Sequence, residues 1–462
     1  MASKVYDLLL SRGRIIDPLN QRDGVADLGI VGGKVVEVGE ELPVDRAAQT
    51  VAVDGRLVLP GLIDPHVHLS YWFGCQAGYR MLARAGITTA VDAAGPPDEI
   101  IRGLRERGAG INVATHNVVW PGRFVPSTDP SKSDIDRFIE NSLRGGAIAL
   151  KLLGGHFPLT AEATARVIEQ AASAGVFVTF HVGTTRTPGD LNGFFEAVEL
   201  AGGRRLHVAH MNAYCRGQLS GEPLADAVQA LDVLQRSPNI TSDSYVFSRN
   251  GTPALCTDGV PVSRVTRNWL VEGGYEATES GLTQAILDGF AWVIAERDSE
   301  NVFVQGEEGY AAWREAGTDT GVSFEANPYT SMIPLAIAKD SKGDFIVTAL
   351  CTDGGGIPRN ALVEKGLGLV RLGALTIQEF VQKASIAPAH LYGFNDKGHL
   401  GPGADADVTV LDPLHGVATH TIVEGRIVME GGRVLGRGGT LLVTTAGVKE
   451  ARAGGVEYQV IA

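Results

Sequence analysis

Hydrophobic and polar positions divide the chain into two kinds of segment. Near both ends, clusters of β-forming residues alternate with Gly and Asp, as in VADLGIVGGKVVEVG before residue 58 and VATHTIVEGRIVMEGGRVLG after residue 400. Such clusters between turn residues predict short strands. Because the two termini of a domain often lie close together, we expect residues 1–58 and 400–462 to form one small β-sandwich domain with a C-terminal tail.

The middle segment, residues 59–399, alternates apolar strand-like runs with amphipathic helix-like runs. AIALKLLGG precedes TAEATARVIEQAASAG, and VFVTFHVG precedes LNGFFEAVELAGG. This alternation predicts an α/β fold with a parallel sheet, and about eight such units favour a (β/α)8 TIM barrel. The alternative is an open doubly wound sheet, which the lack of a GxGxxG turn and of a GxxxxGK[ST] loop disfavours.

One stretch, about residues 248–340, interrupts this alternation and is too long for a simple connection. It contains several large aromatic residues, among them Trp269, Trp292 and Trp313. In a barrel, an excursion of this length typically carries a lid, a subdomain or an oligomer contact. A purely structural insertion is an equal alternative.

Residues with metal-binding chemistry stand at the ends of predicted strands. The motif PGLIDPHVHLS places His66 and His68 two positions apart, so both side chains project from one face of a strand. Later apolar strands end in, or are followed by, further candidates, namely Lys151, His181, His210 and Asp353. Each of these residues could instead have a structural role without a metal, such as capping a turn for Lys151 or forming an Asx-turn for Asp353. Together they predict a metal site, because barrel strands converge at their carboxyl ends.

The chain resembles the amidohydrolase superfamily, specifically the dihydroorotase/hydantoinase-like cyclic amidohydrolases, with D-aminoacylase-like features. The residues that carry the resemblance are Pro60-Gly61-Leu62-Ile63-Asp64-Pro65-His66-Val67-His68, Gly86-Ile87-Thr88-Thr89, Lys151, His181, His210, Asp353, Ala387-Pro388-Ala389 and Gly403-Ala404-Asp405-Ala406-Asp407. The resemblance covers nearly the whole chain, apart from about residues 248–340 and the last 20 or so.

The resemblance implies a binuclear metal centre. His66, His68 and Asp353 would hold the more buried ion, and His181 and His210 the second. Lys151 would bridge both ions as a CO2-derived carbamate, because an ammonium has no lone pair with which to bind a metal. A hydroxide between the two ions would attack the amide carbonyl, with Asp353 as general acid/base. Zn²⁺ is the first expectation, with Mn, Fe, Co and Ni as alternatives.

Substrate contacts are predicted less sharply. His116 and His156 lie near the predicted ends of the third and fourth strands, and Asp243 and Tyr245 lie in the seventh. Arg186 and Arg216 follow the strands of His181 and His210 and could bind a substrate carboxylate. Each of these side chains could instead be packed in the core or lie on the solvated surface without contacting a substrate. Of the two histidines in RLHVAHMN, His210 is the expected ligand, and His207 is expected to pack under a helix.

The predicted activity is hydrolysis of an amide C–N bond, in a cyclic amide or ureide such as a hydantoin, a dihydropyrimidine or an imide. Deacylation of an N-acyl-(D-)amino acid is the alternative, supported by Asp243 and Tyr245. A heterocycle deaminase is disfavoured by Lys151. A non-catalytic, assembly-forming relative is disfavoured because all six metal positions are filled.

Composition and net charge limit the classes of molecule that the protein is expected to bind. The chain has 462 residues and a formal net charge of −13, which disfavours binding to nucleic acid or to an anionic membrane. The four cysteines form no CxxC pair, and no signal-peptide-like or membrane-spanning apolar run is present, so we expect a cytoplasmic protein. A small-molecule substrate and a homo-oligomer are expected, as such barrels commonly associate.

Overall fold

Parallel strands form a closed barrel in the computed structural model, which describes residues 5–461. Residues 1–4 and 462, at the outer ends of the two terminal segments, lie outside the described residues. The first seven barrel strands are β6 (Leu62–His68), β7 (Ile87–Asp92), β8 (Ala109–Val118), β9 (Ala149–Leu153), β10 (Phe177–His181), β11 (Leu206–Val208) and β12 (Ile240–Ser244). β19 (Ala349–Leu350) pairs with β12 and β20 (Gly354–Gly355) pairs with β6, so residues 349–355 close the ring as its eighth strand.

Amphipathic helices cover the outside of the barrel. These are α1 (Gly78–Arg84), α2 (Pro97–Arg107), α3 (Lys132–Gly145), α4 (Ala161–Ser173), α5 (Leu191–Ala201), α6 (Pro223–Arg236), α11 (Leu362–Arg371), α12 (Ile377–Val381) and α13 (Ala387–Tyr392). Their apolar faces pack on the strands, as Phe138, Val167 and Phe194 do in one continuous core. The predicted TIM barrel is therefore confirmed.

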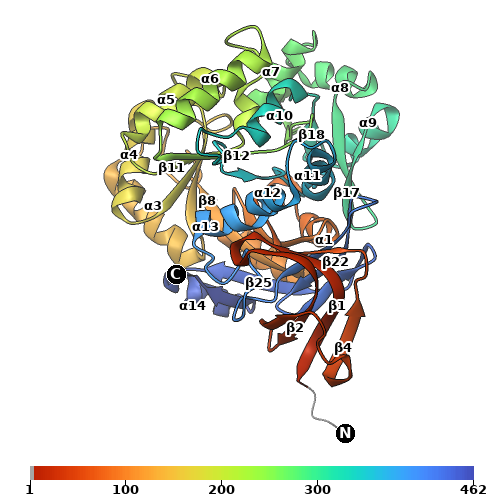
Figure 1. Ribbon diagram of the computed structural model, residues 1–462. Coiled ribbons are helices and arrows are strands. Elements are labelled where there is room, and N and C mark those ends of the chain that lie inside the picture. The colour runs from red at the N-terminus through yellow and green to blue at the C-terminus, as the bar shows by residue number, and fades with distance from the viewer. Residues whose placement is uncertain (1–4, 462) are drawn as a thin grey trace.

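The two chain ends share a second sheet, as expected. β1 (Tyr6–Asp17), β2 (Arg22–Val31), β3 (Lys34–Gly39), β4 (Ala47–Ala52) and β5 (Leu57–Pro60) come from the N-terminal segment. β21 (Val408–Asp412), β22 (Val417–Val423), β23 (Arg426–Glu430) and β24 (Arg433–Val434) come from the C-terminal segment. The antiparallel pair β5–β21 joins the two sets, so that β21 and β5 lie between β22 and β1 in one sheet, which Figure 1 shows at the side of the barrel.

The last residues leave this sheet and return to the barrel. β25 (Gly438–Val443) pairs in parallel with β8, and β26 (Glu457–Val460) pairs with β25, with α14 (Val448–Ala453) between them. Leu441 and Val443 of β25 are fully buried with Ile101 and Leu104 of α2. No local sequence pattern predicts this pairing, because the two strands are more than 300 residues apart in the chain.

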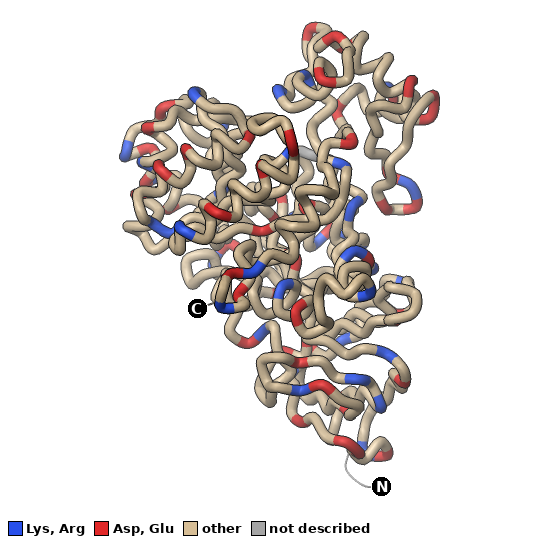
Figure 2. Tube along the Cα trace, turned by 45° about the horizontal axis from the view of Figure 1, so that its top comes forward, with Lys and Arg blue, Asp and Glu red and all other residues tan. Residues whose placement is uncertain are grey.

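The insertion is a small subdomain with its own core. Its elements are β13 (Thr252–Pro253), β14 (Cys256–Thr257), β15 (Val260–Pro261), α7 (Arg264–Glu272), α8 (Glu279–Leu287), β16 (Trp292–Arg297), β17 (Glu300–Val304), α9 (Gly306–Glu315), β18 (Gly321–Ser323) and α10 (Tyr329–Ile337). Trp313 is fully buried among Leu282, Val293 and Phe324. Figure 2 shows most of the subdomain as a lobe beside the barrel.

Charges are dispersed over the molecule. Figure 2 shows acidic and basic residues interspersed along the chain rather than gathered on one face. Among residues 5–461, no helix is both long and apolar enough to span a bilayer.

Candidate metal centre and substrate cavity

The His66–His68 strand is fixed to its neighbour by a buried carboxylate. Asp64, which is fully buried, accepts hydrogen bonds from the backbone N–H of His66 (3.2 Å) and from the backbone and hydroxyl of Thr352 (3.2 and 2.5 Å). These contacts tie β6 to the eighth strand next to Asp353. The two strands that carry the predicted first metal site are thereby held in register.

His66, His68 and Asp353 form a compact cluster of ligand-type atoms. One such atom from each residue lies within 4.8 Å of the others. His68 Nε2 is 3.0 Å from Asp353 Oδ1, and His66 Nε2 is 3.7 Å from the same oxygen. Two imidazoles and a carboxylate at this spacing suit a divalent transition-metal ion.

Lys151 lies directly beside this cluster. Its Nζ is 3.2 Å from His66 Nε2, and the side chain is fully buried. Burial lowers the pKa of Lys151 to about 8, although the nearby Asp353 and Asp243 oppose this shift. A lysine with this pKa has a substantial neutral fraction near physiological pH, which is the form that reacts with CO2.

His181 and His210 form the other side of the site. Their ring centroids are 4.7 Å apart, and His210 is 4.9 Å from the ring of His66. A Cβ on Gly155 would lie 2.3 Å from His181 Nε2, so any larger residue at this position would clash with the imidazole ring. The buried Nδ1 of His210 has no hydrogen-bond partner within residues 5–461, which fits a nitrogen available for a metal. The structure thus brings together all six predicted ligands.

Asp243 lies beneath the cluster and not at the substrate cavity, in contrast to the prediction. Its Oδ2 is 3.5 Å from His66 Nδ1 and 3.3 Å from His207 Nε2, and its Oδ1 accepts the backbone N–H of His210. Burial alone would raise the pKa of Asp243, but hydrogen bonds with both histidines hold it well below its usual value. Asp243 is therefore placed to orient His66 and the backbone of His210, as a carboxylate behind a set of metal ligands does.

His207 also departs from its predicted place. Whereas the sequence predicts that it packs under a helix, its ring contacts Asp243 inside the barrel, and its Nδ1 lies 3.0 Å from Thr241 Oγ1. His210 is displaced from regular strand geometry by a positive φ of 33°, after β11 has ended at Val208. Strand alternation therefore does not extend from His207 to His210.

A cavity of about 410 Å³ opens above the ligands. His156 and Tyr245 line it as predicted, and so does Arg216. His116 does not reach it, because β8 continues to Val118 and the buried His116 ring packs on Tyr392, with centroids 5.6 Å apart. Arg186 also lies away from it, where its Nε donates to Glu196 at 2.6 Å.

The insertion supplies one wall of this cavity. Its lining residues there are Asn250, Gly251, Pro253, Arg264, Val265, Asn268, Trp269 and Glu272. Other lining residues, including Trp72 and His156, come from loops after barrel strands. The insertion is therefore part of the site and not only a structural addition.

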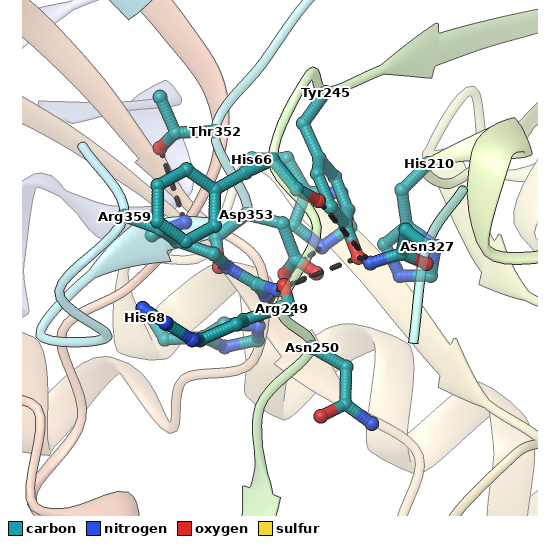
Figure 3. Close-up of polar contacts among 12 residues, drawn as sticks. His66, His68, His210, Tyr245, Arg249, Asn250, Asn327, Thr352, Asp353 and Arg359 are labelled. Carbon is teal, nitrogen blue, oxygen red and sulfur yellow. Dashed lines mark hydrogen bonds and ion pairs between the residues drawn. The ribbon is translucent and has the colours of Figure 1, made fainter. Parts of the chain in front are cut away.

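Arg359, which the sequence analysis missed, anchors Asp353. It is 2% exposed, and its Nη2 is 2.5 Å from Asp353 Oδ2 while its Nε donates to the Asp353 backbone carbonyl at 2.7 Å. Asp353 adopts a positive φ of 50°, a conformation unusual for a non-glycine residue. Arg359 also contacts the Tyr245 hydroxyl through its Nη1, at 3.4 Å, and Figure 3 shows the three side chains together. No local sequence pattern marks such a residue, which follows Asp353 in a loop.

Comparison with known proteins agrees with this geometry. The sequence pattern described as "Amidohydrolase family" matches residues 57–428. The chain belongs to the amidohydrolase family. A dihydroorotase from Anaeromyxobacter sp. (strain K) is 26% identical over 489 residues, covering 92% of this chain and 98% of that protein. This amidohydrolase is thus a metal-dependent hydrolase of C–N bonds.

Solved structures share its fold. A D-aminoacylase variant solved with copper chloride is 16% identical, with a TM-score of 0.67 over 95% of this chain and 100% of that one. A dihydropyrimidinase from Brevibacillus agri is 17% identical, with a TM-score of 0.59 over 93% of this chain and 97% of that one. At these identities the similarity establishes the barrel with its β-rich domain.

Proposed function

We propose that this amidohydrolase opens a cyclic amide or ureide, such as a hydantoin, a dihydropyrimidine or an imide, at an amide C–N bond. The observation that carries the proposal is the place of Lys151, buried beside His66 and facing the same centre as His181 and His210. A carbamate on Lys151 would offer two oxygens to two ions. A single-ion deaminase has no need of such a bridge.

The protein's own residues provide the proton transfers. Divalent cations, zinc by preference, would acidify the attacking water and polarise the scissile carbonyl. Burial would raise the pKa of Asp353, but Arg359, His210 and His68 hold it well below its usual value, so the carboxylate is ionised and accepts a proton. Its Oδ1 faces the histidines, while Arg359 holds its Oδ2. Asp353 then delivers the proton to the leaving nitrogen, as general acid/base catalysis requires.

Deacylation of an N-acyl-(D-)amino acid is the second candidate. Tyr245 and Arg216 on the cavity wall favour it, because both can bind the carboxylate of such a substrate. The non-catalytic alternative has little support, since five of the six predicted ligands, His66, His68, His181, His210 and Asp353, line an open cavity.

Mass spectrometry of products tests the proposal. Zinc-loaded protein with bicarbonate is incubated with hydantoins, dihydropyrimidines, cyclic imides and N-acyl-D-amino acids, and Asp353→Asn serves as the inactive control. A ring substrate that gains one water and remains one molecule supports the proposal. Cleavage only of N-acyl amino acids into acid and amine would replace it with the second candidate, and loss of ammonia would indicate a deaminase.

A further inference from the structure

Three polar side chains meet inside the barrel beneath the metal-site histidines. His207 of β11 lies opposite Thr241 of β12, and Asp243 follows Thr241 by two positions, so both β12 side chains project from the same face of the strand. His207 and Asp243 are fully buried. Neither His207 nor Thr241 lines the substrate cavity, so their contacts do not serve substrate binding.

The contacts of His207 favour one arrangement of its protons. Its Nε2 lies 3.3 Å from Asp243 Oδ2, and its Nδ1 lies 3.0 Å from Thr241 Oγ1. An ionised carboxylate only accepts hydrogen bonds, so a neutral imidazole has to carry its single proton on Nε2 in order to donate to Asp243. Nδ1 is then free to accept a hydrogen bond from the Thr241 hydroxyl. The threonine thereby favours the form of His207 that donates to Asp243.

Asp243 in turn contacts two of the predicted metal ligands. Its Oδ2 is 3.5 Å from His66 Nδ1, and its Oδ1 accepts the backbone N–H of His210. Within residues 5–461, the buried Nδ1 of His66 and the buried Nε2 of His207 have no better hydrogen-bond partner, so both depend on this one oxygen. A proton on His66 Nδ1 leaves Nε2, which lies 3.7 Å from Asp353 Oδ1, to bind a metal ion.

We propose that His207 is a positioning residue that acts on the metal centre through Asp243. Its Nε2–H holds the Asp243 carboxylate in the place from which it orients His66 and the backbone of His210. The Thr241 hydroxyl fixes the tautomer that His207 needs for this contact. Hydrogen-bond partners behind a ligating histidine affect metal affinity in the same way. The inference concerns metal binding, so it does not depend on which bond the enzyme cleaves.

Zinc affinity, measured by competition with a chelator, tests the role of His207. His207→Phe keeps a ring but removes both nitrogens, so zinc affinity should fall by about tenfold or more. His207→Gln can place an N–H near Asp243 and should recover a large part of this loss. Thr241→Val removes only the hydroxyl and should lower the affinity by about threefold. A native affinity in His207→Phe, or an equal loss in His207→Gln, would overturn the proposal.

A double variant separates an effect through Asp243 from a general weakening of the barrel. In an Asp243→Asn background, His207→Phe should lower zinc affinity by less than about a further twofold, because the carboxylate that it holds is no longer present. Full, multiplicative losses would overturn the proposal. The control is His420→Phe in the terminal sheet, where the ring also lies between a threonine, Thr419 (3.2 Å), and a carboxylate, Glu430 (3.6 Å). This control should bind zinc with native affinity.

A measurement on the native, metal-free protein decides the matter even if a variant fails to fold. In protein with nitrogen-labelled histidine, NMR spectra distinguish the protonated ring nitrogen of His207 from the unprotonated one. We expect a protonated Nε2 and an unprotonated Nδ1 at about pH 8, as the contacts with Asp243 and Thr241 require. A proton on Nδ1 would overturn the proposal. Neither zinc affinity nor this spectrum involves a substrate, so both tests are separate from that of ring opening.

Discussion

The strand ends of the barrel and the insertion contribute to one cavity in different ways. The six predicted metal ligands lie on barrel strands, or within two residues of their ends, and the hydrogen-bonded ladder of these strands fixes their spacing. The cavity wall of the insertion is held instead by a separate core around Trp313 and Phe324. We infer that the chemistry and the choice of substrate depend on different parts of the chain, which can be altered independently.

The largest effect should come from Lys151. In Lys151→Ala, loss of the bridging ligand should lower kcat by about 10³-fold or more and reduce bound zinc below two ions per chain. Zinc content by plasma mass spectrometry and steady-state kinetics measure this. The control is Lys383→Met, at the other fully buried lysine, whose Nζ donates to the Val347 carbonyl outside the site. Native activity in Lys151→Ala would contradict the account.

Asp243 should have the next largest effect. Asp243→Asn weakens the contacts that orient His66 and His207, so zinc affinity should fall by about 10- to 100-fold. Competition with a chelator measures the affinity. Asp17→Asn, at a fully buried aspartate in the terminal sheet, should leave it unchanged. If the two variants bind zinc equally well, Asp243 has no role in orienting the ligands.

The insertion should affect substrate binding alone. Trp269→Ala removes an aromatic face of the cavity, so KM should rise by about tenfold while zinc content stays native. Tyr310→Ala, within the same subdomain core but not on the cavity, should leave KM unchanged. Loss of zinc from Trp269→Ala would show that the two regions are not independent.

The smallest effect concerns pH. Burial lowers the pKa of Lys151 from 10.5 to about 8, so the neutral amine increases as pH rises to about 8 and then saturates. Reactivation of metal-free protein with zinc, at fixed dissolved CO2, should speed up about fivefold from pH 7 to 8 and less than about twofold from pH 8 to 9. A constant tenfold rise per pH unit would indicate an ordinary lysine. Stopped-time assays of regained activity measure the rate.

Sequence patterns identified the residues whose position follows from local structure. His66, His68, Lys151 and His181 belong to strands that the apolar runs delimit, so barrel geometry alone brings them together. The terminal sheet was predictable for the same reason, since its short strands lie between clear turn residues.

Residues placed by distant contacts were not predictable in this way. Asp243 was expected at the substrate, because the strand pattern does not reveal that His66 and His207 enclose it. Arg186 was expected at the cavity, but its loop turns toward Glu196. The pairing of β25 with β8 likewise depends on burial against α2, which no local pattern shows.

The most direct test of the central claim is anomalous diffraction from crystals of the zinc-loaded protein grown with bicarbonate. We expect two zinc peaks, one among His66, His68 and Asp353 and one between His181 and His210, with carbamate density extending from Lys151 to both. A single peak with an unmodified Lys151, or zinc bound elsewhere, would contradict the binuclear centre.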